Sequence, residues 1–308
     1  MGAQSVAAHV IARNPACFKQ FFDVDLVVDE GEPSLFQRVL RLWYNQKKRK
    51  GDESPMILND IIRTLEEKHG CTVGAAIRDA ESGEIFASHR EELVFKSASL
   101  IKTPIMLCTL EEVEKGALTL DTQIAVQPAQ CVGDEAPVIR NGTDVPVSVL
   151  LEYMITDSNN SATNVLIDLL GMDRVNAFSQ RSGLADTLLR RHMLDYEAAR
   201  QGNENRTSAA DMLRLYTLLH RGEVFTPFQC ETALPILLRQ HDKELLMFVN
   251  PAQKSAHKTG GLSDIAHDAG ILYGENRTLI FAVLVTAPSD AQCIALLQEL
   301  SPQVMAML

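Results

Sequence analysis

The sequence predicts an α+β fold in which an antiparallel sheet is built from both ends of one domain and helices fill its middle. Apolar runs rich in Val, Ile and Ala indicate strands near both ends, over residues 71–79, 85–88, 254–260, 265–273 and 278–286. Between them, apolar residues recur at spacings of three and four, which indicates helices over 100–114, 145–170 and 208–220. Strands from both ends can share a sheet when the intervening helices pack beside it.

The ends of these elements carry matching local signals. Glu81-Ser82-Gly83-Glu84 is a turn sequence between the first two strands. Gly116 and Gly171 follow apolar helical repeats and are expected to end them. Shorter helical patterns at 58–65 and 290–300 flank the strands, so we expect helices there as well.

The chain divides into an extension and a domain. Residues 1–55 are expected to be an N-terminal extension that ends in the basic run Lys47-Lys48-Arg49-Lys50 and a Gly-Asp-Glu-Ser-Pro linker. Such a run could contact a membrane or nucleic acid, although a solvated hinge is the favoured interpretation of so short a cluster. Residues 56–308 are expected to be the folded domain, with the sheet from 56–98 and 250–308 and the helical part from about 99–220.

Composition narrows the classes of partner. The 308 residues carry a formal net charge of −11, which argues against binding a nucleic-acid backbone. No apolar stretch approaches the ~20 residues of a membrane span. We therefore expect a small-molecule substrate and a monomer. The start, MGAQSVAAHVIARNP, lacks a basic region followed by a long apolar one, which predicts a cytoplasmic protein; a different true start would make it periplasmic or secreted.

Cysteine usage points to free thiols and no metal. The 6 cysteines are scattered, without a CxxC or Cys/His cluster: Cys17, Cys71, Cys108, Cys131, Cys230 and Cys293. We expect unpaired thiols and neither a metal nor an organic cofactor.

Three short motifs occur in order and carry the candidate chemistry. They are Ser99-Leu100-Ile101-Lys102, Ser158-Asn159-Asn160 and Lys258-Thr259-Gly260, called below the first, second and third motifs. A serine hydroxyl needs a nearby base to become a nucleophile, and residues three apart share a helix face, so Lys102 can reach Ser99. A helix start also offers unpaired N–H groups to a developing oxyanion, and it favours a neutral lysine.

The third motif suits the recognition of an anion. On a strand edge, Lys258 and Thr259 supply a cation and a hydroxyl to a substrate carboxylate. Gly260 and Gly261 permit close approach, and the Gly261 N–H can serve as a second oxyanion donor. Each motif alone is weak, since Ser158-Asn159-Asn160 is also an ordinary helix cap. The ordered set in matching structural contexts favours catalysis.

The three motifs match the S-x-x-K, S-D-N and K-T-G set, and the chain resembles the class A β-lactamases from about residue 58 onward. The segments that carry the resemblance are 95–104, 150–171, which includes Asn164, and 257–272. It implies an all-helical domain beside an α/β sandwich with a five-stranded antiparallel sheet, and a site between them. It also implies that Ser99 is acylated, Lys102 activates it and Ser158 passes a proton to the leaving nitrogen. By the same resemblance Asn160 holds the substrate amide, Lys258 and Thr259 bind its carboxylate, and the Ser99 and Gly261 N–H groups form the oxyanion hole.

Two departures from that family stand out. Asn159 replaces the usual Asp of the second motif, a mild change at an anchoring position. The E-x-x-L-N pattern, whose glutamate activates the deacylating water, is absent from residues 190–212. An ungapped alignment places His192 at the glutamate position, and Asp195 or Glu197 are candidate substitutes or merely solvated carboxylates. Without a deacylating base, an acyl-enzyme persists.

Three functions remain open at this stage. The first is a class A type β-lactam hydrolase, weak if the deacylating base is missing. The second is a peptidase, amidase or esterase on the same scaffold that acts on a D-Ala-D-Ala-like or other small acyl substrate. The third is a non-catalytic binding module, which need not keep both Lys102 and Lys258.

Overall fold

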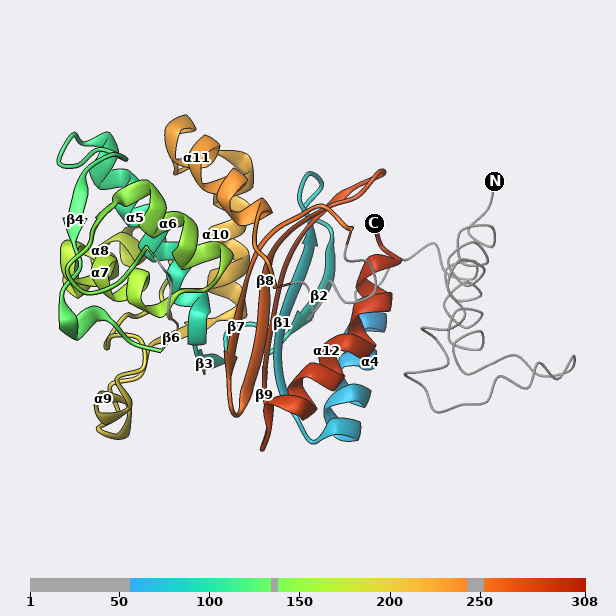
Figure 1. The fold of residues 1–308 in the computed structure, drawn as a ribbon. Coiled ribbons are helices and arrows are strands. Elements are labelled where there is room, and N and C mark those ends of the chain that lie inside the picture. The colour runs from blue at the N-terminus through green and yellow to red at the C-terminus, as the bar shows by residue number, and fades with distance from the viewer. Residues whose placement is uncertain (1–55, 134–137, 243–251) are drawn as a thin grey trace, which may run out of the picture. The chain divides into compact units, whose positions relative to one another are not determined.

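The computed structural model describes residues 56–133, 138–242 and 252–308 (Figure 1). Contacts divide the chain into two units between Glu53 and Ser54, and all described residues belong to the second. The expected extension and its basic run lie outside the described residues. No helix among the described residues is long and apolar enough to cross a membrane.

A five-stranded antiparallel sheet forms the centre of the described unit. Its strands, in the spatial order β2-β1-β9-β8-β7, are Ile85–His89, Thr72–Asp79, Thr278–Thr286, Ile265–Tyr273 and Ser255–Leu262. The sheet thus combines two strands from the beginning of the domain with three from its end, as the sequence predicts. Strand β7 lies at an edge, so one of its sides is open to a ligand.

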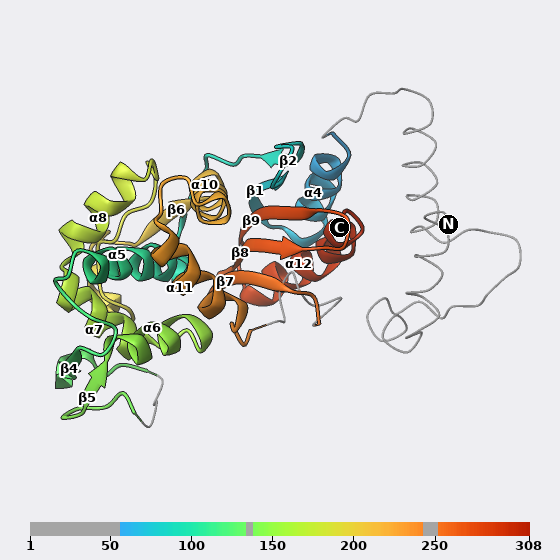
Figure 2. The ribbon, with the colours of Figure 1, turned by 90° about the horizontal axis from the view of Figure 1, so that it is seen from above.

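Helices cover both faces of the sheet (Figure 2). On one face, α4 (Met56–His69) and α12 (Asp290–Met305) pack onto an apolar cluster that includes Ile62, Phe281 and Leu296. On the other, α10 (Ala209–Arg221) and α11 (Pro227–Leu238) pack onto a second cluster that continues into the helical part. Because both faces of the sheet are buried, nearly every residue of β9 is apolar.

The helical part contains the remaining elements. They are η1 (Ala98–Ile101), α5 (Lys102–Glu114), η2 (Pro128–Gln130), α6 (Val147–Thr156), α7 (Asn160–Leu170), α8 (Met172–Arg181) and α9 (Tyr196–Arg200). Two small strand pairs join it: β3 (Val94–Lys96) with β6 (Arg206–Ser208), and β4 (Gln123–Ala125) with β5 (Asp144–Pro146). These three-residue strands were not predicted, because they are too short to show a periodic pattern.

Two local differences from the expected helices position the motifs. The expected helix at 100–114 opens with the 3-10 turn η1, and its α-helical part starts only at Lys102. The expected helical region at 145–170 is broken between α6 and α7, where Ser158 has φ of 54°. Both breaks fall on motif residues, so Ser99 lies in a 3-10 turn and Ser158 in the link between α6 and α7, and neither serine is within an α-helix.

Candidate active site

The turn η1 holds Ser99 against the backbone of strand β7. Ala98, directly before the serine, has φ of 44°, an uncommon conformation for a residue with a Cβ atom. A Cβ atom added at Gly260 would lie 3.2 Å from Ser99 N and 3.2 Å from Ser97 O. Only a glycine fits there without displacement, and the first and third motifs therefore touch through their backbones. Ser99 itself is half-buried.

Lys102 lies one turn after Ser99, and its side chain reaches the second motif. Its Nζ donates to Ser158 O at 2.5 Å and to Asn160 Oδ1 at 2.9 Å, and lies 3.1 Å from Ser158 Oγ. Lys102 is fully buried, with an exposed fraction of 0%. A buried amine with polar partners is the environment that a catalytic lysine base requires.

The second motif is a tight turn between two helices. Asn159 is the N-cap of α7, where its side chain accepts a hydrogen bond from Ala162 N at 2.8 Å. The cap, together with the positive φ of Ser158, turns the Ser158 hydroxyl toward both lysines. Asn at the middle position thus does the anchoring work that the resemblance assigns to Asp.

The third motif brings a second buried lysine to the same hydroxyl. Lys258 Nζ donates to Ser158 Oγ at 3.1 Å and to Thr259 O at 3.0 Å. Gln240 Nε2 donates to Thr259 Oγ1 at 3.0 Å and fixes that hydroxyl. Burial lowers the pKa of the Lys258 ammonium to about 8, while the carboxylates of Asp242 and Asp268 oppose this shift.

Because both lysines contact the Ser158 hydroxyl, protonation of one disfavours protonation of the other. Two buried ammonium groups around one oxygen repel each other, and an oxygen that accepts from Lys258 can donate its own hydrogen to a neutral Lys102. A consistent arrangement is therefore a charged Lys258, the Ser158 hydroxyl and a neutral Lys102. In this arrangement, side chains from three segments that are far apart in the sequence form one hydrogen-bonded path along which a proton can pass.

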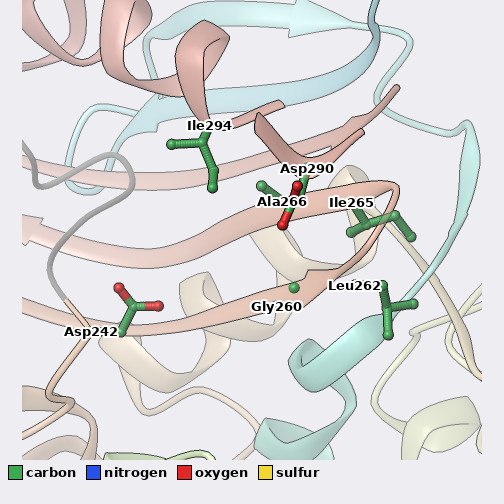
Figure 3. Close-up of a pocket in the computed structure, with 8 residues that line it drawn as sticks. Asp242, Gly260, Leu262, Ile265, Ala266, Asp290 and Ile294 are labelled. Atoms are coloured by element: carbon green, nitrogen blue, oxygen red, sulfur yellow. The ribbon is translucent and has the colours of Figure 1, made fainter. Parts of the chain in front are cut away.

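A cavity of about 410 Å³ opens beside the end of β7. It is lined by Asp242, Gly260, Gly261, Leu262, Ile265, Ala266, Asp290 and Ile294 (Figure 3). Gly261, the expected second oxyanion donor, is exposed on this edge strand. None of Ser99, Lys102, Ser158 and Lys258 lines this cavity, which reaches the third motif only at Gly260.

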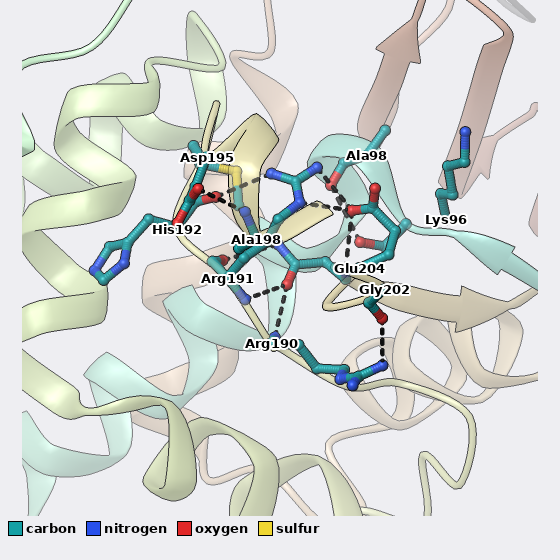
Figure 4. Close-up of polar contacts among 12 residues, drawn as sticks. Lys96, Ala98, Arg190, Arg191, His192, Asp195, Ala198, Gly202 and Glu204 are labelled. Carbon is teal, nitrogen blue, oxygen red and sulfur yellow. Dashed lines mark hydrogen bonds and ion pairs between the residues drawn. The ribbon is translucent and has the colours of Figure 1, made fainter. Parts of the chain in front are cut away.

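The segment 190–205, called below the 190–205 loop, makes polar contacts within itself, such as the ion pair of Arg191 with Glu204 (Figure 4). Two asparagines hold its backbone. Asn164 on α7 accepts from Met193 N at 2.7 Å and donates to Met193 O at 3.3 Å. Asn205 Oδ1 accepts from the N–H groups of Arg190 and Arg191 at 2.7 and 3.0 Å. The loop residue that Asn164 holds through its backbone is therefore Met193, whose side chain is buried with an exposed fraction of 6%.

The polar candidates of this loop make other contacts. His192 Nε2 lies 2.7 Å from Asp168 Oδ1, and its side chain is 36% exposed. Asp195 is the N-cap of α9, where it accepts from Ala198 N at 2.9 Å. Glu197 is 63% exposed and pairs with Arg200 on its own helix. The structure does not bring these side chains together with the two lysines, because each one has a partner within the loop or on α7.

Sequence reasoning missed several residues around the site. Gln240 lies beyond the expected helix 208–220, in a segment without a motif. His257 and Asp268 are adjacent to motif residues, but their pairing depends on strand register. Met193, one position after His192, is the residue whose backbone Asn164 holds, and this contact between α7 and the loop depends on tertiary structure that no local pattern reveals.

The described residues hold no group of three or more His, Cys, Asp or Glu side chains that could bind a metal. The five cysteines among these residues are free thiols.

Comparisons with known proteins identify the family of the described unit. The family model described as "Beta-lactamase enzyme family" matches residues 57–308. A β-lactamase of Rhodobacter capsulatus is 30% identical over 180 residues, which cover 57% of this chain and 61% of that protein, less than two thirds of its length. β-Lactamase VEB-1 of Pseudomonas aeruginosa is 24% identical over 246 residues, which cover 74% of this chain and 81% of the relative.

Solved structures show the same fold. A mutant of PBP-A, in an acyl-enzyme complex with penicillin G, has a TM-score of 0.73 and 26% identity, and the match covers 82% of this chain and 96% of that one. A β-lactamase from Sphaerobacter thermophilus has a TM-score of 0.72 and 25% identity, covering 80% of this chain and 95% of the other.

The sheet flanked by helices, with three ordered motifs, defines a serine hydrolase of the β-lactamase-like superfamily. Since the family model spans the domain from residue 57 to the end, the chain belongs to the β-lactamase enzyme family.

Proposed function

We propose that Ser99 opens the ring of a β-lactam and forms an acyl-enzyme, and that slow deacylation limits hydrolysis. The observation that supports it best is the convergence of Lys102 and Lys258 on the Ser158 hydroxyl, each at 3.1 Å, beside a serine packed against Gly260. A surface serine and lysine that share a helix face by chance would have no second lysine buried against them. A penicillin acyl-enzyme of PBP-A, a structural relative, is consistent with this chemistry.

The acylation step follows from this arrangement. Ser99 Oγ bonds to the lactam carbonyl carbon and passes its proton to the neutral amine of Lys102. The carbonyl oxygen becomes an oxyanion, which the N–H groups of Ser99 and Gly261 stabilise. The carbon–nitrogen bond then breaks, and the ring nitrogen receives a proton through Lys102 and the Ser158 hydroxyl. Asn160 binds the amide side chain of the substrate.

Recognition of the substrate rests on the third motif. Lys258 in its charged form and the Thr259 hydroxyl, oriented by Gln240, bind the substrate carboxylate. Charge-assisted hydrogen bonds of this kind are stronger than neutral ones. The β-lactam carboxylate and the free carboxylate of a D-Ala-D-Ala peptide offer the same chemistry to this pair.

We infer that deacylation is the weak step, because the residue of the 190–205 loop that Asn164 of α7 holds is Met193 and not a carboxylate. A thioether cannot take a proton from water, so the acyl-enzyme lives long. The same observation favours a second candidate function, a penicillin-binding peptidase or esterase that β-lactams inhibit. We also expect the protein to act as a monomer on a small molecule, since the proposed residues come from one chain.

The test is to incubate the protein with penicillin G and a chromogenic cephalosporin, and to follow intact mass and colour. We expect a mass increase equal to one penicillin and slow steady-state colour. In Ser99→Ala the adduct should be absent, whereas the neighbouring Ser97→Ala should still be labelled. Equal labelling of wild type and Ser99→Ala would remove Ser99 from this role, and fast turnover without an adduct would refute slow deacylation.

A further inference from the structure

A second cavity, called below the arginine cavity, lies beside strand β1 and helix α10. Its volume is about 330 Å³, and no residue of the three motifs belongs to its lining. Cavities of about 300–1,000 Å³ are the usual size of sites for small organic ligands. The residues that line it are Arg78, Ala210, Leu213, Arg214, Thr217, Leu218, Arg221 and Glu223.

Three arginines from two distant segments meet at this cavity. Arg214 and Arg221 are seven residues apart on α10, so they lie two turns apart on one face of the helix. Arg78 lies on β1, two positions after Ala76, and therefore on the face of the sheet that α10 covers. In a chain with a formal net charge of −11, three arginines around one cavity make a local positive site.

The guanidinium of Arg214 is held in place by backbone. Its Nε donates to Ser182 O at 2.8 Å. A Cβ atom added at Gly183 would lie 2.5 Å from Arg214 Nε and 2.8 Å from its Cζ, so the side chain occupies space that only a glycine leaves open. Among the described residues Arg214 has no ion pair, and its two terminal nitrogens have no hydrogen-bond partner. Arg214 is thus positioned by the protein, while most of its donors are left for another molecule.

The other two arginines are also held by a few contacts. Arg221 Nη2 donates to Ala80 O at 3.1 Å, and its Nη1 lies 3.6 Å from Glu223. Arg78 Nη2 donates to Glu91 Oε1 at 3.3 Å. Arg78 Nε is buried without a hydrogen-bond partner among the described residues. Because an unsatisfied buried N–H is costly, Arg78 has donor capacity that the protein itself does not use.

The carboxylates near the cavity do not balance these cations. Glu223 is the acidic residue among the lining residues, and its side chain is 55% exposed. Three positive charges against one negative charge leave a net charge of +2 on the lining. When Glu91 is included, with its side chain 22% exposed, the net charge is still +1. The cavity therefore favours an anion.

The shape of the cavity narrows the class of anion. Guanidinium groups present forked N–H donors that match the oxygens of phosphates and carboxylates. A phosphate ester offers three terminal oxygens and up to two charges to the three arginines, whereas a carboxylate offers two oxygens and one charge. Leu213, Leu218 and Ala210 add an apolar wall that a free phosphate ion would not use. These features together fit a phosphate group on a small organic molecule.

We propose that the arginine cavity binds the phosphate group of a small phosphorylated organic molecule, with Arg214 as its principal contact. The organic part lies against the apolar wall from α10. This site is separate from the proposed function, because it uses none of the motif residues. Its presence or absence can be measured in protein that has met no β-lactam.

The test is isothermal titration calorimetry with phenyl phosphate, inorganic phosphate and benzoate. We expect phenyl phosphate to bind with one site per chain, and the other two more weakly, since one lacks the apolar part and the other a second charge. Arg214→Gln should weaken binding of phenyl phosphate at least about tenfold, because charge-assisted hydrogen bonds are lost.

The matched control is Arg63→Gln, which removes the same charge from an exposed side chain of α4 on the opposite face of the sheet. It should bind phenyl phosphate like wild type. An equal loss of affinity in both variants would show a general effect of charge and overturn the proposal. Absence of saturable binding to wild type up to about 10 mM would overturn it as well.

Two further measurements locate the ligand and identify its source. In NMR titrations phenyl phosphate should shift the amide signals of Gly183 and Arg214 and leave those of Gly260 and Gly261 in place. Shifts confined to Gly260 and Gly261 would place the anion at the third motif and overturn the proposal. If inorganic phosphate binds as tightly as phenyl phosphate, the free ion is the ligand, and the proposal of an organic phosphate is wrong.

Discussion

The convergent cluster (Ser99, Lys102, Ser158 and Lys258) and the 190–205 loop lie side by side but use polar residues in opposite ways. In the cluster, buried amines from two segments point at one hydroxyl. In the loop, polar side chains mostly bind the loop's own backbone or one another, as Asn205 and the Arg191–Glu204 pair do. On the proposed function the first region moves a proton, whereas the contacts of the second region fix the shape of the loop.

If the proposed function holds, this difference leads us to expect that acylation is faster than deacylation. Burying charged groups around one oxygen atom lowers the stability of the folded state. Such clusters are typical of sites where the charged groups act on a substrate. The loop contributes an apolar side chain, Met193, at the point where Asn164 clamps it. On the proposed function, the described residues therefore supply an acylating cluster, whereas the loop residue held by Asn164 is not a carboxylate.

The largest effect is expected when the proposed base of the cluster, Lys102, is removed. Lys102→Ala should slow acylation by about 10² to 10⁴-fold, the usual contribution of a general base. Lys115→Ala, at the far end of the same helix with a side chain 54% exposed, should acylate at the wild-type rate. Stopped-flow acylation with a fluorescent penicillin measures both, and an unchanged rate in Lys102→Ala contradicts the assignment.

The next largest effect should come from giving the loop a base. Met193→Glu should shorten the lifetime of the acyl-enzyme at least about tenfold, since a carboxylate can activate water. Met193→Gln has nearly the same shape without a base and should leave the lifetime unchanged. Intact mass after removal of free β-lactam gives the decay rate, and equal decay in both variants would show that the loop position is not the limit.

A smaller effect should follow from removing the two hydrogen bonds by which Asn164 holds the backbone of Met193. Asn164→Ala removes both hydrogen bonds to Met193 and should lower the free energy of unfolding by about 1–3 kcal/mol. Asn141→Ala, at an exposed loop residue, should be nearly neutral. Urea denaturation compares the two, and equal stability would mean that water replaces the lost partners.

The smallest effect is expected at the acidic residues of the loop. Glu197→Gln and Asp195→Asn should change turnover by less than about twofold, because an exposed ion pair contributes little and asparagine is also a good cap. Steady-state hydrolysis of the chromogenic cephalosporin measures this. A loss of tenfold or more would instead identify a deacylating base that moves into the site when substrate binds.

Much of this molecule could be predicted from local patterns. Periodicity located the five strands of the sheet and the main helices, and their order required strands from both ends to meet. The three motifs could be recognised because each is short and contiguous. The same approach failed for β3–β6 and β4–β5, which are three residues long and exist only because a partner strand is present.

By itself the sequence determined the fold class, the family resemblance and the identity of the candidate catalytic residues, since these depend on local periodicity and contiguous motifs. The tertiary structure alone decided that two lysines 156 positions apart in the chain share one hydroxyl. It also decided that Met193 is the residue clamped by Asn164, and that His257 pairs with Asp268. Such contacts depend on register and burial, and distance along the chain says nothing about them.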